Sequence, residues 1–372
     1  MKKFIPLLML LGISVIALGA DSTSTPTPAP ASKISWSGFV DAYYSKNFNS
    51  PSTQLNQLRN FDLYENQFSL NMAKLSVQEQ AQPVGFRVDL AIGTGNDIVQ
   101  GLINPINGTT VASTTTLNLV EQAYLTAVAP IGSGLTIDVG KFATMMGYEV
   151  IESNGNWNYS RSLMFAWAIP YYHTGMRLTY PVSGNFTVAL HLVNSWNTDI
   201  DNNHSKSVGL ALNYSPTLTT AVTLNGMSGF EQAPGAPYGK KDVAELIVTQ
   251  QVGDNLSFAL DGTYGREPVQ GTMNIWKGVA VYAKENLSSH SDAALRGEVY
   301  YDPNGYTTGA LYPKATYKEV TVTYEYRPLD PLILRFELRD DFANGPSFVS
   351  ASTGNLVRSS QPTALLGAIV TF

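Results

Sequence analysis

Two stretches near the C-terminus alternate strictly between apolar and polar side chains. Residues 319–327 read EVTVTYEYR and residues 332–341 read LILRFELRDD, so apolar side chains occupy every second position over most of both stretches. A period of two places alternate side chains on opposite faces of a β-strand. Each strand therefore has one apolar face and one charged face. A soluble sandwich also contains such strands, so two of them alone do not identify a membrane protein.

Similar runs recur along nearly the whole chain and predict about 16 strands. An even number is typical of bacterial single-chain transmembrane barrels. The facing of the runs that begin at Val120 and Ile275 is ambiguous. The predicted strands are 34–45, 66–77, 86–93, 120–129, 135–140, 171–180, 186–196, 208–214, 218–225, 244–252, 256–264, 275–287, 295–301, 317–326, 332–341 and 363–372.

The connections between these strands alternate in length. Every second connection is short, and the others are longer and rich in Asn, Gly, Ser and Thr. A sandwich gives no reason for this regularity, whereas transmembrane barrels place short turns in the periplasm and long loops outside. The pattern predicts an all-β fold, a transmembrane antiparallel β-barrel of about 16 strands, with both termini in the periplasm. The long connections are 47–63, 94–116, 142–170, 197–207, 227–243, 266–274, 302–316 and 342–361.

Composition supports one closed sheet and narrows the possible partners. Charged residues make up 14% of the chain and the mean hydropathy is -0.05, against a typical charged share of about 25%. A wall with one lipid face and one water face explains this balance. The formal net charge is -6, which disfavours nucleic acid because phosphate binding needs clustered Lys and Arg. The absence of cysteine excludes disulfides and thiolate metal sites.

The N-terminus has the pattern of an export signal. Lys2 and Lys3 precede an apolar run over 4–18, and small residues allow cleavage near residue 20. We therefore expect a signal peptide at 1–20, a Pro, Ser and Thr rich periplasmic tether at 21–33, and a barrel at 34–372. No later segment is apolar and long enough to cross a membrane as a helix.

The connection 142–170, which follows the fifth predicted strand, is the longest. A segment this long without regular structure is usually functional or disordered, and its aromatic rings argue against disorder. We interpret it as a loop folded into the barrel that narrows a pore. Its candidate constriction residues are Glu149, Glu152, Trp157, Tyr159, Arg161, Phe165 and Trp167.

The polar parity of the predicted strands identifies the lumen wall. Glu149 and Glu152 would face wall arginines and set a transverse field that selects solutes by charge, with the acidic net charge favouring cations. The aromatic rings of the loop would pack against the wall or, alternatively, form a stacking track for sugars. The predicted wall residues are Asp41, Arg87, Asp89, Asp138, His173, Arg177, Glu245, Asp261, Arg296, Glu298, Glu325, Arg335, Glu337 and Arg339.

Other polar motifs do not form a chemical site. His204-Ser205 with Asp199 and Asp201 has the residue types of a hydrolase, but these residues share one polar loop rather than a rigid scaffold. Residues 199–210 resemble a calcium loop without its required Gly and bidentate Glu. Gly93-Thr94-Gly95 lacks the third glycine of a dinucleotide site. We expect no catalytic residue, no metal site and no cofactor.

The last strand and several short motifs resemble a known family. The chain ends at Phe372, like the C-terminal strand by which outer-membrane barrels are recognised for insertion. From about Trp36 onward the sequence resembles the OmpL-like β-barrel porin-2 family, which implies a passive pore without catalytic residues. The motifs that carry the resemblance are 121–124 (EQAY), 140–142 (GKF), 147–149 (GYE), 158–162 (NYSRS), 170–175 (PYYHTG), 180–182 (YPV) and 193–196 (VNSW).

The sequence thus predicts an outer-membrane porin of a Gram-negative-type bacterium, a passive diffusion channel for small hydrophilic solutes or ions. Its expected partners are outer-membrane lipid, the barrel assembly machinery, the solutes and, by analogy with porins, two further copies in a homotrimer. Two alternatives remain open at this point. One is a barrel with an occluded lumen whose outer loops bind partners, and the other is an outer-membrane hydrolase.

Overall fold

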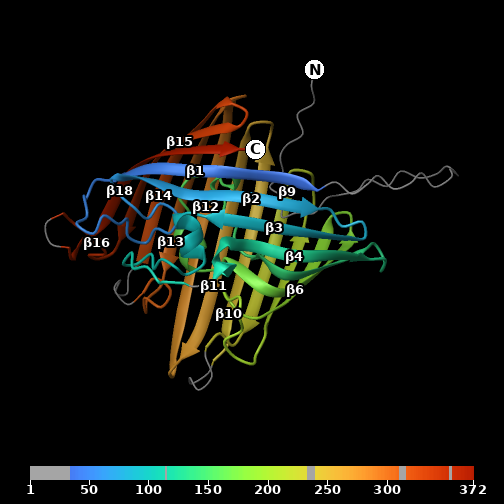
Figure 1. Ribbon diagram of the computed structural model, residues 1–372. Coiled ribbons are helices and arrows are strands. Elements are labelled where there is room, and N and C mark those ends of the chain that lie inside the picture. The colour runs from blue at the N-terminus through green and yellow to red at the C-terminus, as the bar shows by residue number, and fades with distance from the viewer. Residues whose placement is uncertain (1–33, 114, 233–238, 310–315, 352–353) are drawn as a thin grey trace.

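The fold is a closed antiparallel barrel (Figure 1). The computed structural model describes residues 34–113, 115–232, 239–309, 316–351 and 354–372. The predicted signal peptide, and all of the predicted tether, lie outside these described residues. Within them the first eight strands of the wall are β1 (Ser35–Asn47), β2 (Gln67–Glu79), β3 (Val84–Ile92), β4 (Val120–Ala129), β5 (Leu135–Ala143), β6 (Tyr172–Ser183), β7 (Phe186–Val193) and β8 (Ser207–Tyr214).

The second half of the wall completes sixteen strands within the described residues. These strands are β9 (Thr220–Gly229), β10 (Lys241–Val252), β11 (Leu256–Val269), β12 (Thr272–Ser288), β13 (Ser291–Tyr301), β14 (Thr316–Leu329), β15 (Leu332–Ala343) and β18 (Ser360–Thr371). Consecutive strands pair from β1 to β15, β15 pairs with β18, and β1 pairs with β18 to close the cylinder. Closure leaves no unpaired strand edge, which a wall in hydrocarbon requires. The prediction of about 16 strands is confirmed.

The wall is apolar outside and charged inside. In β14 the side chains of Val320, Val322 and Tyr324 are exposed, whereas the intervening Thr321 and Thr323 are buried. In β15 the apolar side chains alternate in the same way with the buried Arg335, Glu337 and Arg339. A soluble protein would bury the apolar set and expose the charged set. This inverted pattern is the one expected when the outer face lies in lipid.

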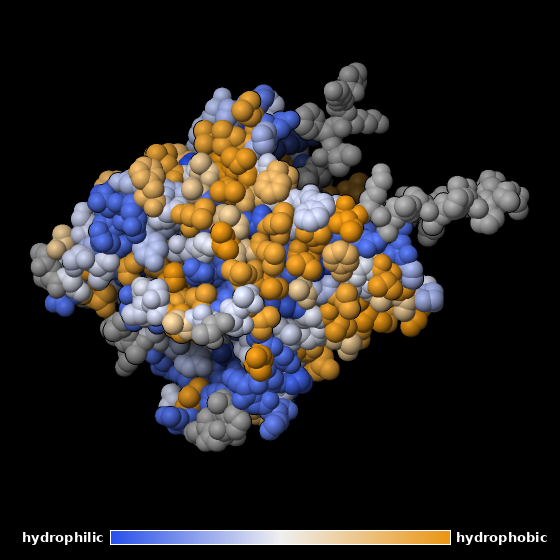
Figure 2. Space-filling model, in the orientation of Figure 1, coloured by the Kyte–Doolittle hydropathy of each residue, from blue (hydrophilic) through white to orange (hydrophobic). Residues whose placement is uncertain are grey.

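Aromatic side chains mark both ends of the outer face. Trp36, Tyr326 and Phe372 are exposed near the end with the short turns, and Tyr264 and Phe342 are exposed near the opposite end. Such girdles flank the apolar band of transmembrane barrels. Figure 2 shows apolar residues spread over the strands that face the viewer, with hydrophilic residues gathered toward the lower and left edges.

The predicted alternation of short and long connections has one exception. We expected a long loop at 266–274, but β11 and β12 continue and are joined only by Gln270 and Gly271. Both residues have positive φ, 49° and 81°, as in the type I′ turns that join twisted strands. The prediction of a loop at this position was wrong because the polar residues there still pair across the hairpin.

The remaining elements are short and lie in the long connections. They are the helices α1 (Thr94–Val99) and α2 (Leu163–Trp167), the 3-10 turns η1 (Thr116–Leu119) and η2 (Ser153–Gly155), and the two-stranded sheet β16 (Phe348–Val349) and β17 (Leu356–Arg358). Among the described residues, every helix falls short of the length and apolarity needed to cross a membrane.

Candidate functional site

Residues 144–171, between β5 and β6, form the centre of the candidate site, and we call them the inner segment. Most of their side chains are buried. Apart from the short turn η2 and the short helix α2, the backbone here has no regular structure and must find other hydrogen-bond partners. It finds them on the inward side chains of the wall.

Wall carboxylates accept hydrogen bonds from consecutive backbone amides of the inner segment. Glu337 of β15 accepts from Tyr159 N at 2.6 Å and Ser160 N at 3.0 Å. Glu298 of β13 accepts from the first two amides of α2, Leu163 N and Met164 N, both at 2.6 Å. Carboxyl oxygens at this position satisfy amides that the helix itself leaves free.

A second pair of carboxylates holds the start of the segment. Glu245 of β10 accepts from Gly147 N at 2.9 Å, and Asp261 of β11 accepts from Tyr148 N at 3.2 Å. Glu245 also accepts from Asn225 of β9 at 2.8 Å. These contacts satisfy backbone amides that have no partner in regular structure, and they fix where the segment enters the barrel.

Wall arginines bind the carbonyl groups of the same segment. Arg335 donates to Ser153 O and Asn156 O, both at 2.6 Å. Arg339 donates to Arg161 O at 2.6 Å. Carboxylates on the amides and guanidinium groups on the carbonyls together hold the backbone from both sides.

Arg296 of β13 is the most enclosed of these cations. Its side chain donates to Glu149 of the segment and to Glu319 of β14, both at 2.6 Å, and to Ser160 O at 2.7 Å. Glu149 in turn accepts from Ser162 N at 2.7 Å. The segment and the wall therefore share one buried ionic network.

The predicted constriction residues pack against other residues rather than project into open space. Trp157 contacts Tyr148 and Tyr282 edge to face. Phe165 packs on Phe61 of the β1–β2 connection, and Trp167 Nε1 donates to Leu58 O at 3.1 Å. These contacts indicate that the aromatic rings pack against their neighbours rather than form a stacking track for sugars.

Tyr159 and Arg161 are tied down as well. Tyr159 donates through its hydroxyl to Asp41 of β1 at 2.6 Å. Arg161 donates to the carbonyls of Val150, Tyr159 and Ile151. Both side chains hold the fold of the inner segment.

Glu152 lies at a cluster of carboxylates. Its oxygen and those of Asp89 and Glu121 lie within 4.8 Å of one another, a spacing that suits a cation. The Lys74 ammonium of β2 bonds to Asp89 at 2.9 Å, to Glu121 at 3.0 Å and to Glu152, so it supplies the counter-charge. Burial acts to raise the pKa of Glu152, but Lys74 outweighs it and holds the pKa of Glu152 below its ordinary value.

Polar side chains of β3, β5 and β6 pair mainly with one another, with fewer contacts to the segment. Arg177 of β6 pairs with Asp138 of β5 at 2.8 Å, and Arg87 of β3 pairs with Asp89 at 3.0 Å. His173 is buried, and its ring contacts Ser195 O and Thr144 Oγ1 of the inner segment, both at 3.1 Å. The arginines here are partly exposed, unlike those that hold the segment.

The structure places all the predicted wall residues on the inward parity of their strands. The observed charges are arranged differently from the predicted transverse field. Arg335 and Arg339 bind carbonyls of the segment and do not face Glu149 or Glu152 across an open gap. Sequence reasoning also missed Lys74 and Glu121. Lys74 lies on the polar parity of its strand, a signal that was present, whereas Glu121 faces inward beside an irregularity between Asp89 and Leu90.

The polar loop considered for hydrolysis has other pairings. Asp199 bonds to Lys141 at 2.9 Å, and Asp201 bonds to Lys206 and to Asn203 N. Both carboxylates thus pair with lysines, whereas a catalytic triad uses a carboxylate to orient its histidine.

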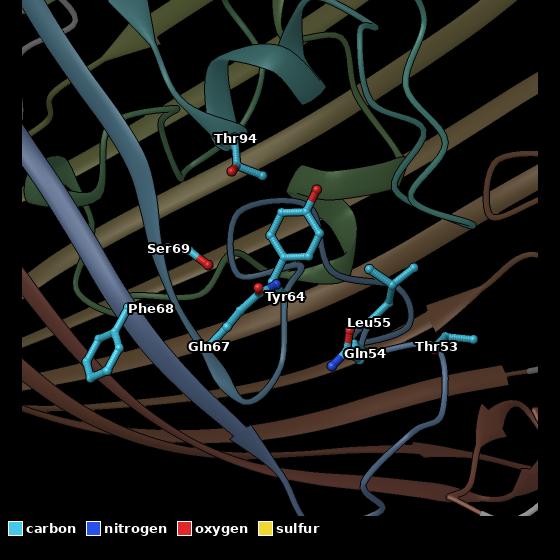
Figure 3. A pocket seen from close by; sticks show the side chains of 8 residues that line it. All are labelled: Thr53, Gln54, Leu55, Tyr64, Gln67, Phe68, Ser69 and Thr94. Atoms are coloured by element: carbon cyan, nitrogen blue, oxygen red, sulfur yellow. The ribbon is translucent and has the colours of Figure 1, made fainter.

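A pocket of about 510 Å³ lies at the outer rim, away from the inner segment. Its lining comes from the β1–β2 connection, the start of β2 and Thr94 of α1. Figure 3 shows Tyr64 between Thr94 and Leu55, with Phe68 pointing away from the others. The pocket is open to the surroundings and does not connect the predicted wall residues.

Fold and site together define a class, the transmembrane β-barrels with a long connection folded against the inner wall. The sequence matches, over residues 33–372, the family described as "Putative beta-barrel porin-2, OmpL-like". The chain belongs to this family, as its motifs predicted. It is a porin of the outer membrane of a Gram-negative-type bacterium. No curated protein matches the chain significantly.

Solved structures share the fold at low sequence identity. The anion-selective porin from Comamonas acidovorans has a TM-score of 0.63 at 11% identity, covering 92% of this chain and 100% of that one. The outer membrane channel DcaP of Acinetobacter baumannii also has a TM-score of 0.63 at 11% identity, covering 92% and 97%. Salmonella typhi OmpF, in complex with daunomycin, has a TM-score of 0.58 at 13% identity, covering 92% and 98%.

Proposed function

We propose that this porin passes small hydrophilic solutes or ions by passive diffusion, through a lumen that the inner segment narrows. The observation that carries the proposal is the difference between the two parts of the wall. Glu298, Glu337 and Arg339 are buried against the segment, whereas Arg87 and Arg177 keep part of their surface open to water. The route for solutes runs along the second part, over β3 to β7, and at the end with the short turns it also passes the partly exposed Lys284 of β12 and Arg327 of β14.

Conductance in planar bilayers tests this route. The protein should give stable steps, and replacing residues 145–170 by a short Gly linker should enlarge them because the lumen is then wider. That deletion bares several wall charges and can prevent folding. A milder variant uses the absence of native cysteine: Glu152→Cys, labelled with a bulky thiol reagent, should lower conductance, whereas labelled Val322→Cys on the outer face should not.

One observation favours a second function, a barrel with an occluded lumen whose outer loops bind partners. The inner segment bonds to inward side chains from β1, β2, β6 and β9 to β15, which is much of the circumference. Absence of any conductance from folded protein would favour this function over diffusion. We propose no catalytic role, and hydrolysis of lipid or peptide that is lost in His204→Ala would contradict this.

Assembly follows from the outer face and the chain end. We infer that the apolar outer face contacts outer-membrane lipid and the neighbouring copies of a homotrimer, which native mass measurement in detergent can test. We also infer that Phe372 is read by the barrel assembly machinery. It exchanges backbone hydrogen bonds with Gly38 at 2.9 and 3.0 Å and stays exposed. Phe372→Ala should reduce the amount inserted in cells.

A further inference from the structure

We propose that the open part of the lumen selects small hydrophilic anions, although the chain as a whole is acidic. This inference rests on the proposed diffusion route and names the class of solute that the route prefers. It follows from which member of each ion pair faces water.

In the ion pairs of the open lumen, the cation is exposed and the carboxylate is buried. The side chains of Arg87, Arg177, Lys284 and Arg327 expose between 22% and 33% of their surface, and their partners Asp89, Asp138 and Asp292 expose at most 5%. A solute in the lumen therefore meets guanidinium and ammonium groups first. The carboxylates lie behind them, against the wall.

The same order holds at other inward pairs. Lys241 exposes 17% of its side chain and its partner Glu267 exposes 1%. Glu325, which also contacts Arg327, exposes 10%. Among the described residues the order is reversed at three pairs: Glu152 exposes 24% beside Lys74, Asp199 exposes 23% beside Lys141, and Glu325 exposes 10% beside Arg335. Two accessible carboxylates, Glu152 and Asp199, thus stand among a larger number of accessible cations.

The inner segment removes the other acidic groups from the solvent. Glu245, Asp261, Glu298 and Glu337 are buried because they bind its backbone amides. Wall arginines on that side are buried as well, so the segment hides charges of both signs. The net charge of -6 is consequently a poor guide to the field that a solute meets.

These cations lie at different depths in the barrel, so their electric field acts along the path of the solute. Arg177 lies midway along β6, while Lys284 and Arg327 lie near the ends of their strands at the short turns. A cleft lined by one sign of charge between low-dielectric walls concentrates counter-ions. Small anions are therefore enriched from the periplasmic mouth to the middle of the barrel.

Reversal potential in a KCl gradient tests this inference. The intact protein in a planar bilayer should give the sign expected for chloride, with a chloride to potassium permeability ratio above unity. The ratio should fall as salt rises, because the Debye length shortens from about 10 Å at 0.1 M to about 3 Å at 1 M. A potassium preference, or none, would overturn the inference and leave the channel itself standing.

A charge-neutral double variant shows where selectivity comes from. Arg177→Gln with Asp138→Asn removes one exposed cation and one buried carboxylate, so the ratio should move toward unity although the net charge is unchanged. The matched control is Arg266→Gln with Asp242→Asn, a pair on the outer face at 3.0 Å, which should leave the ratio unchanged. Equal effects of both double variants would contradict the inference. Absence of conductance from the intact protein would overturn the channel and the inference together.

Discussion

Individual charged residues inside this barrel act mainly as structural partners of a buried backbone. Arg296 illustrates this, because its guanidinium group joins Glu149 of the inner segment to Glu319 of β14 with every side chain almost fully buried. A buried ion pair gains less than its Coulomb energy because both ions lose their hydration. Removing only one ion of the pair is much more destabilising, since the remaining buried charge then has no partner.

We predict that Arg296→Met strongly destabilises the barrel. Glu149 loses its paired cation and Glu319 keeps only Arg339 at 3.5 Å, and breaking a buried pair in this way costs about 3–5 kcal/mol. Urea unfolding in detergent, followed by tryptophan fluorescence, measures the loss. The matched control is Arg266→Met, whose side chain is 52% exposed and whose pair contributes about 0–1 kcal/mol. Equal shifts of the two unfolding midpoints would contradict the prediction.

At the scale of elements, the strands could be predicted and the path of the inner segment could not. Alternation predicted β14 and β15 because every residue of a barrel strand faces one of two contrasting surroundings. The contacts of Glu298 and Glu337 with backbone amides carry no comparable pattern. They join groups more than a hundred residues apart, and backbone amides are the same in every sequence.

The prediction of a long loop between β11 and β12 failed for a local reason. Residues 266–274 contain Pro, Gly and Asn, which are typical of loops. In the structure, Glu267 faces inward and accepts from Tyr306, and Val269 pairs with Thr272. Polar composition therefore does not distinguish a loop from a strand that continues past the apolar band.

The wall and the inner segment also meet through close packing. A Cβ atom added at Gly367 of β18 would lie 2.5 Å from the ring of Tyr159. Gly367→Ala should displace this ring and loosen the segment, which limited proteolysis within 144–171 would detect. The control is Gly262→Ala in β11, where the nearest atom lies at 3.9 Å. Unchanged cleavage in Gly367→Ala would show that the ring moves without releasing the segment.

At the scale of the whole molecule, the barrel distributes its side chains in the opposite way to a soluble protein. Its outer surface carries the apolar set of every alternating strand, and its interior carries an ionic network between wall and segment. Lipid makes the first arrangement favourable, and the inner segment makes the second possible by pairing the wall charges. The lumen left beside the segment is lined by accessible cations, so solute preference depends on where the segment lies.

The lipid face should show a penalty for charge that depends on depth. Val322 lies at the middle of β14 and Tyr326 near its end, both exposed on the outer face. Val322→Arg places a cation near the bilayer midplane, which costs about 2–4 kcal/mol, whereas near the interface the cost falls to about 0–1 kcal/mol. After refolding into lipid vesicles, the folded fraction seen by heat-dependent gel migration should fall for Val322→Arg and stay near that of the unchanged protein for Tyr326→Arg. Equal folded fractions for the two variants would mean that β14 does not cross the bilayer with this face toward lipid.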